Sequence, residues 1–116
     1  VSVIRANAFR ECSSLGSVIF ESDSSLALIE NHAFRLATSL TAITIPASIG
    51  RIGIDAFIQC FSLSSVIFES DSSLTLIDNN AFRSASSLTA LTIPASVTRI
   101  GDHVFYQSFP FGHLPI

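Results

Sequence analysis

The chain is organised around the stretch Ile77-Asp-Asn-Asn-Ala-Phe82-Arg-Ser-Ala-Ser-Ser-Leu88-Thr-Ala-Leu91-Thr-Ile93-Pro94, because its pattern recurs along the whole sequence. The shared skeleton is I-x-x-x-A-F-x-x-A-x-x-L-x-x-L-x-I, and it starts at Ile4, Ile29, Ile52, Ile77 and Ile100. Steps of 25, 23, 25 and 23 residues separate its phenylalanines, Phe9, Phe34, Phe57, Phe82 and Phe105. A period of this length is typical of a solenoid, in which stacked units bury an apolar face that none could bury alone.

The composition fits one array, residues 1–116, of about five coils that alternate between 25 and 23 residues. With 48% hydrophobic and 13% charged residues, the chain can build a core only if that core runs its full length.

Polar residues interrupt every apolar run, so no segment approaches the roughly 18 residues of a transmembrane helix. A net charge of −3 without a basic stripe argues against a nucleic-acid partner. The start at Val1 within a repeat, without Met, indicates a processed chain or part of a longer protein.

Each repeat contains one predicted strand of the L-x-x-L-x-L type, whose alternate residues point into the coil. These segments span residues 15–20, 40–45, 63–68 and 88–93. We expect them to form one parallel sheet. The fifth coil keeps the register, since Phe111, Leu114 and Ile116 fall where Leu88, Leu91 and Ile93 fall one coil earlier.

The return from each strand takes one of two forms. Glu-Ser-Asp-Ser-Ser-Leu closes the 25-residue coils at 21–26 and 69–74, and Ile-Pro-Ala-Ser-(Ile/Val) closes the 23-residue coils at 45–49 and 93–97. Beyond each return, the Ala-Phe-Arg triplet predicts a single helical or 3-10 turn on the opposite wall, with Phe inward and Arg outward. Coils about 4.8 Å apart then stack the phenylalanines into a ladder on the order of 20 Å long.

The combined pattern resembles the BspA-type, or Treponema pallidum-type, leucine-rich repeats of bacterial and protist surface proteins. It is plainest in Ala56-Phe57-Ile-Gln-Cys60-Phe-Ser-Leu63 and in Leu91-Thr-Ile93-Pro94-Ala-Ser96-Val97-Thr-Arg-Ile100-Gly101. The resemblance implies a right-handed coil with one parallel sheet and short helical or 3-10 turns opposite. It also implies an extracellular or cell-surface, adhesin-like protein that binds a matrix, host or microbial surface protein.

The two cysteines, Cys12 and Cys60, occupy the small position three residues after Phe. They lie two coils apart, which places them roughly 10 Å from each other, beyond the 7 Å or so that a disulfide allows between Cα atoms. We therefore expect two buried free thiols, with a bridge or a metal site as the less favoured alternative.

The other polar positions have simple interpretations as turn or surface residues. His32 and His103 share one wall position with Asn7, Asp55 and Asn80, and no metal-ligand spacing accompanies them. Acidic residues recur in the return turns at Glu21, Asp23, Glu69 and Asp71. They are expected to cap the turns, with calcium binding as the alternative.

Arginines recur after the ladder Phe at Arg10, Arg35 and Arg83, in a row that Ile58 and Tyr106 interrupt. They are expected to form a solvated wall, with anion binding as the alternative.

No catalytic motif, cofactor motif or metal motif stands out, and the chain is not expected to be an enzyme. The best candidate surface is the outward face of the predicted strands, which suits a protein partner better than a small molecule. Its residues are Ser17, Ile19, Glu21, Ala42, Thr44, Ser65, Ile67, Glu69, Ala90, Thr92 and His113. The alternative is that these are only surface residues that favour strands.

The sequence thus supports two functions of different classes. The first is a non-catalytic protein-binding module of an adhesin-like protein. The second is a building block that self-associates end to end, because Val1 opens the first coil without a polar cap. Pro110 and Pro115 argue against pairing at the C-terminal end, since Pro removes a donor from an edge strand.

Overall fold

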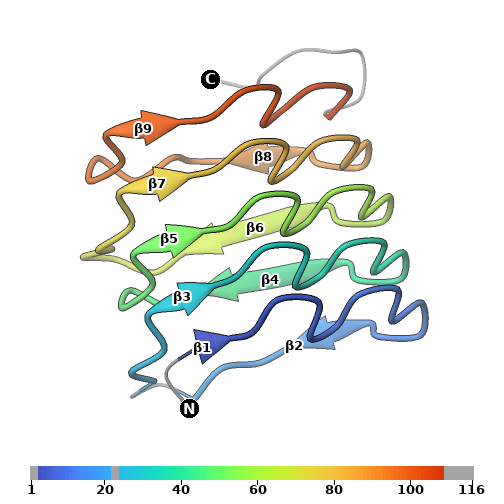
Figure 1. The fold of residues 1–116 in the computed structure, drawn as a ribbon, viewed down its shortest axis with the longest axis horizontal. Helices are drawn as coiled ribbons and strands as arrows, with labels where there is room; N and C mark the ends of the chain where they lie inside the picture. The colour runs from blue at the N-terminus through green and yellow to red at the C-terminus, as the bar shows by residue number, and fades with distance from the viewer. Residues whose placement is uncertain (1–2, 22–23, 109–116) are drawn as a thin grey trace.

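A computed structural model describes residues 3–21 and 24–108, and these residues form a parallel β-solenoid. Within this part of the chain nine strands form two parallel sheets, and the two sets of strands run in opposite directions on opposite sides of the coil (Figure 1). The four-stranded sheet contains β2 (Ser17–Val18), β4 (Ala42–Ile45), β6 (Ser65–Phe68) and β8 (Ala90–Leu91). The five-stranded sheet contains β1 (Val3–Ile4), β3 (Leu28–Ile29), β5 (Arg51–Ile52), β7 (Leu76–Ile77) and β9 (Arg99–Ile100).

Each strand pairs with its counterpart in the next coil, so the register follows the sequence period. In the four-stranded sheet Ser17 lies opposite Ala42, and Ala42 lies opposite Ser65. In the five-stranded sheet Ile4 lies opposite Ile29. The four-stranded sheet is the one that the L-x-x-L-x-L segments predict, and the solenoid architecture is confirmed.

Two details of the predicted architecture differ. The expectation of one sheet is incomplete, because the first Ile of each skeleton and the residue before it also form two-residue strands that stack into the second sheet. The predicted helical or 3-10 turn is wrong for residues 3–21 and 24–108, where the wall after each Ile consists of β-turns. A helix needs consecutive right-handed residues, and this wall changes backbone hand twice in each coil.

The change of hand occurs two residues before and two residues after every ladder Phe. The φ angles at these positions lie between 55° and 62°. The residues are Asn7 and Glu11, His32 and Leu36, Asp55 and Gln59, Asn80 and Ser84, and His103 and Gln107. Left-handed backbone favours Asn, Asp and His among residues with side chains, which explains the polar column before each Phe.

The wall also joins consecutive coils through backbone hydrogen bonds. In the first coil, Asn7 N–H donates to the carbonyl of Asn31 at 3.2 Å, and Phe9 N–H donates to the carbonyl of Ala33 at 2.7 Å. Glu11 N–H donates to the carbonyl of Arg35, also at 2.7 Å. The same three donors recur in the second, third and fourth coils. All of these wall N–H groups therefore face the C-terminal neighbour.

The core is the predicted ladder of phenylalanine rings. Phe34, Phe57 and Phe82 are fully buried, and each lies parallel to its neighbour, with ring centroids 5.0 Å apart for the first pair and 5.2 Å for the second. The end rungs, Phe9 and Phe105, continue the stack at 5.1 Å and 6.0 Å. Each interior ring is thus in contact with the coil below and the coil above, as the expectation of one shared core requires.

A second ladder, of alternating Asn and Gly, was not anticipated. The Asn31 Oδ1 atom accepts a hydrogen bond from Ile54 N–H in the next coil at 2.8 Å. A Cβ on Gly53 would lie 2.6 Å from this Oδ1 atom and 2.7 Å from the Asn31 nitrogen, so only glycine fits beside it. The same arrangement recurs 48 residues later in the chain, since Asn79 Oδ1 accepts a hydrogen bond from Asp102 N–H beside Gly101.

Candidate protein-binding surfaces

The strand face is defined as the outward positions in and just after the strands of the four-stranded sheet. Thr44 and Ile67 lie opposite each other in register on β4 and β6. Ile19 and Thr92 hold the same position in the flanking coils, one 25-residue step away on either side. The Ile19 side chain is 91% exposed and that of Ile67 is 55% exposed. An aliphatic residue thus alternates with threonine across the face.

The other predicted positions can be placed individually. Exposed side chains are those of Ser17, Glu21, Ala42, Thr44, Glu69 and Thr92, whereas Ser65 is half-buried. Ala90 lies in β8 opposite Ser65, and the structure describes its backbone only. His113 falls outside the described residues.

Two hollows interrupt this face near its C-terminal end. One of about 350 Å³ lies between β6 and β8 and is lined by Ser65, Val66, Ile67, Phe68, Leu91 and Thr92. The other, of about 310 Å³, lies where the return turn of the third coil meets the shorter turn of the fourth, against Glu69, Asp71, Pro94 and Ser96.

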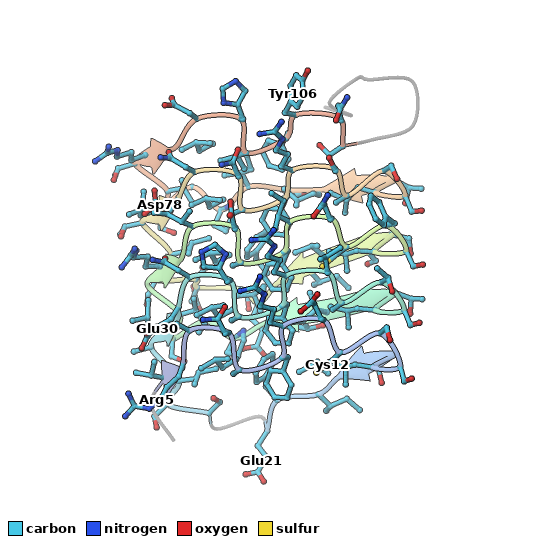
Figure 2. All side chains as sticks on the ribbon, turned by 45° about the vertical axis from the view of Figure 1, so that its right-hand side comes forward. Arg5, Cys12, Glu21, Glu30, Asp78 and Tyr106 are labelled. Atoms are coloured by element: carbon cyan, nitrogen blue, oxygen red, sulfur yellow. The ribbon has the colours of Figure 1, made fainter. Side chains whose placement is uncertain are left out.

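Charge is distributed unequally between this side of the coil and the rest. The strand and return segments, residues 15–27, 40–50, 63–75 and 88–98, carry four acids and neither Arg nor His. All six arginines lie elsewhere, at positions 5, 10, 35, 51, 83 and 99. They belong to the five-stranded sheet and its surroundings or to the β-turns around each ladder Phe, which we call the turn wall. Figure 2 shows Arg5, Glu30 and Asp78 together on one flank, where Arg51 Nη2 also meets Asp78 Oδ2 at 3.2 Å. The strand face is consequently acidic and apolar.

One acid of the return turns, Glu69, caps a neighbouring turn, as turn chemistry predicts. The Glu69 Oε1 atom accepts a hydrogen bond from Ala47 N–H of the preceding coil at 2.9 Å. Ser72 Oγ accepts from Leu74 N–H at 3.1 Å, and Asp71 has a left-handed backbone with φ of 60°. Asp23 lies outside the described residues. Across the described ranges, no three His, Cys, Asp or Glu side chains converge on a common point that could hold a metal ion.

The turn wall carries paired polar groups. His32 Nδ1 lies 3.4 Å from Asp55 Oδ2, and these two residues hold the same left-handed position in consecutive coils. Arg83 lies over the ring of Tyr106, 4.9 Å from its centroid. The incomplete arginine row is therefore held by stacking at its C-terminal end, and Arg10 approaches Glu11 at 3.8 Å at the other end.

The two cysteines are free thiols, as expected, although they differ in burial. Cys60 is fully buried, and its Sγ–H donates to the carbonyl of Phe34 at 3.1 Å. Burial raises the pKa of this thiol from 9.0 to about 12. Cys12 is only half-buried, because it lies in the first coil of the described array. The burial and raised pKa of Cys60 are unlike those of a reactive or metal-binding cysteine.

The N-terminal end of the array forms a third surface. A hollow of about 600 Å³ opens there, with apolar lining from Val3, Ile4, Phe9, Val18, Phe20 and Leu26. Phe9 is 37% exposed, although its equivalents in the next three coils are fully buried. Glu21 extends beyond this end of the coil in Figure 2. The end surface therefore displays the interior of the solenoid.

Over the part of the chain that the structure describes, no helix has the length and apolar character needed to cross a membrane.

Comparison with known proteins relates the chain to bacterial repeat proteins. It is 38% identical to the pneumococcal vaccine antigen PcpA, with a TM-score of 0.77 over 81% of this chain and 24% of that one. It is 28% identical to the leucine-rich repeat protein of T. pallidum, with a TM-score of 0.71 over 78% and 42% of the two chains. A leucine-rich cell surface protein of Faecalibacterium prausnitzii is also 28% identical, with a TM-score of 0.69 over 92% and 34%.

The chain thus spans about a quarter of the length of PcpA. A comparison with curated sequences finds no match. The model of the BspA-type leucine-rich repeat region, in six copies, matches residues 1–115. Together with the parallel coil and the phenylalanine ladder, this match shows that the chain belongs to the BspA-type leucine-rich repeat family.

Proposed function

We propose that this chain is a non-catalytic protein-binding module of a cell-surface or secreted adhesin-like protein, and that the strand face holds the partner. The observation that carries the proposal is the exposure of Ile19, directly after β2, and of Ile67, within β6. Burial of large aliphatic side chains against a partner lowers the free energy of the complex, and clusters of such exposed side chains mark interaction sites. The similar protein of F. prausnitzii, which is described as a cell surface protein, supports the location.

The chemistry of the face also limits the partner. Because the strand and return segments 15–27, 40–50, 63–75 and 88–98 carry four acids and neither Arg nor His, the complementary surface combines apolar side chains with Lys or Arg. A shallow sheet with hollows of a few hundred Å³ fits a protein surface or an extended segment better than a small molecule. We place residues 1–116 in a single array within a longer protein, consistent with the small fraction of PcpA that they span.

The test is binding of the purified chain to immobilised extracellular matrix proteins and to intact microbial cells. The variant Ile19→Asp/Ile67→Asp replaces two exposed residues, so we expect an unchanged fold and at least about a tenfold loss of affinity. The matched control is Arg10→Asp/Arg83→Asp, which changes two residues of the turn wall. Equal binding by the wild type and the strand-face variant would show that the strand face does not contact the partner. Absence of binding to every matrix protein and cell tested would contradict the proposal itself.

A second candidate function is end-to-end self-association. The specific observation in its favour is the hollow at the N-terminal end, where Phe9 lies open although the following rungs are covered. Exposed apolar surface at the end of a repeat array promotes stacking with another array. The proline argument against pairing at the opposite end concerns residues 110 and 115, which lie outside the described part of the chain.

A further inference from the structure

The two hollows of the strand face meet at Phe68 and Thr92, which line both of them. The hollow of about 350 Å³ lies between β6 and β8, beside Ile67. The hollow of about 310 Å³ lies where β6 ends and its return turn begins, beside Glu69. Together the two hollows form one groove that follows the direction of β6, and we call it the β6–β8 groove.

The lining of this groove changes from apolar to acidic along its length. At the strand end the lining includes Val66, Leu91 and Ile67, and the Ile67 side chain is 55% exposed. At the turn end it includes Glu69 and Asp71, which are both exposed. A ligand that is complementary to the whole groove therefore carries an apolar group at one end and a positive charge at the other.

The two carboxylates at the turn end have no positive neighbour. Neither Glu69 nor Asp71 forms an ion pair with a described residue. The Glu69 Oε1 atom accepts the hydrogen bond from Ala47 N–H at 2.9 Å, which holds this carboxylate against the face without neutralising its charge. The turn end is thus a fixed negative site that a cationic side chain of a partner can pair with.

The spacing of the groove is that of an extended chain. Ile67 and Glu69 are exposed, and Phe68 between them is half-buried. Side chains on one face of a strand are about 6.6 Å apart, because each residue advances the chain by about 3.3 Å. An extended partner segment presents its own alternate side chains at the same interval. A partner residue opposite Ile67 would therefore place the residue two positions away opposite Glu69.

We infer that the β6–β8 groove binds an extended segment of the partner protein in which an apolar residue and a Lys or Arg are two positions apart. This inference rests on the proposed protein-binding function, and it adds the form of the partner and the place of its basic residue. A calcium ion is a poorer occupant of the turn end, because it needs six or more oxygen ligands and only two acids line this hollow.

The test is an NMR titration of the complete, isotope-labelled chain with short synthetic peptides, at low ionic strength and in EDTA. The probe is acetyl-Ser-Ile-Thr-Arg-Ser-amide, in which Ile and Arg are two positions apart. We expect saturable shifts of the amide resonances of Ile67, Glu69, Asp71 and Thr92. Acetyl-Ser-Ile-Thr-Glu-Ser-amide reverses the charge, and acetyl-Ser-Thr-Ile-Arg-Ser-amide turns Ile and Arg to opposite faces, so both should bind about fivefold more weakly.

The variant Glu69→Gln/Asp71→Asn removes both charges and preserves the local structure. Gln keeps an oxygen that can accept from Ala47 N–H, and Asn tolerates the left-handed backbone of Asp71. We expect this variant to bind the probe peptide about fivefold more weakly. The matched control is Glu11→Gln/Asp102→Asn, which removes two exposed acids outside the groove and should bind like the wild type.

Three outcomes would overturn the inference. They are the absence of saturable shifts at these amides, equal binding of the Arg and Glu peptides, and unchanged binding by Glu69→Gln/Asp71→Asn. Failure of the proposed function is a different result, since it is measured with matrix proteins and cells. A chain that binds the probe peptide in the groove but binds no matrix protein or cell would contradict the adhesin proposal alone.

Discussion

Phe57 and Phe9 occupy the same position of the same motif, yet one is fully buried and the other is 37% exposed. The rings themselves are placed alike, since each stacks on its C-terminal neighbour at 5.2 Å or 5.1 Å. Only the coil on the N-terminal side differs. The comparison teaches that the repeat sequence determines where a side chain points, whereas neighbouring coils determine how much free energy its burial contributes.

The largest expected effect follows directly from this comparison. Phe57→Ala removes a ring packed on both sides, and we expect the free energy of unfolding to fall by roughly 3–5 kcal/mol. Phe9→Ala removes a ring packed on one side and should cost about 1–2 kcal/mol. Urea titration followed by circular dichroism measures both values. Similar losses for the two variants would contradict the difference between end and interior.

The Asn–Gly ladder gives a second contrast between two glycines. Gly53→Ala places a methyl group against Asn31 and disrupts its hydrogen bond to Ile54, so we expect a loss of roughly 2 kcal/mol. Gly16→Ala is the matched control, because a Cβ there meets nothing within 4 Å. Its effect should stay within about 0.5 kcal/mol. Thermal unfolding of the two variants tests the contrast, and an unperturbed Gly53→Ala would show that the close approach is absent.

The two thiols provide a third contrast, in reactivity. At pH 8 a thiol reagent such as Ellman's reagent should modify Cys12 readily, whereas Cys60 should react only after unfolding, because burial holds its pKa near 12. Rapid modification of both thiols in the native chain would disprove the burial of Cys60.

The same pKa predicts how stability depends on pH. The unfolded chain loses the Cys60 proton above about pH 9 and the folded chain retains it up to about pH 12, so folding becomes less favourable as the pH rises through this window. Cys60→Ala should show a smaller decrease in the free energy of unfolding between pH 8 and pH 10. Identical decreases for the variant and the wild type would contradict the prediction.

The sequence predicted those features that repeat with a period. The phenylalanine ladder, the parallel pairing and the inward residues of the L-x-x-L-x-L strands follow from spacing alone, because stacked coils leave few ways to bury Phe34, Phe57 and Phe82 together. The polar residues before each Phe were correctly interpreted as turn residues. Their left-handed backbone supplies the physical reason for that choice.

Other features could not be derived from hydrophobic spacing. Two-residue strands such as β1 and β3 are too short to show a recognisable pattern. The left-handed backbone at Glu11 and Leu36 breaks the expected helical turn, and neither residue type favours that conformation. The Asn–Gly ladder left a signal that was missed, since Asn31 and Gly53 recur together as Asn79 and Gly101. On the strand face, the pattern identified the outward residues, but the degree of exposure of Ile19 and Ile67 depends on their neighbours.

Amide hydrogen exchange tests the central claim most directly, namely that every interior coil is bonded to the next through its wall N–H groups. The amides of Phe34 and Phe57 donate to the carbonyls of Ala56 and Ala81 at 2.8 Å. We predict that both exchange only through global unfolding, with an exchange free energy equal to the value from urea titration. Exchange of either amide near the rate of an unstructured peptide would contradict the stacked coil and, with it, the direction of the wall.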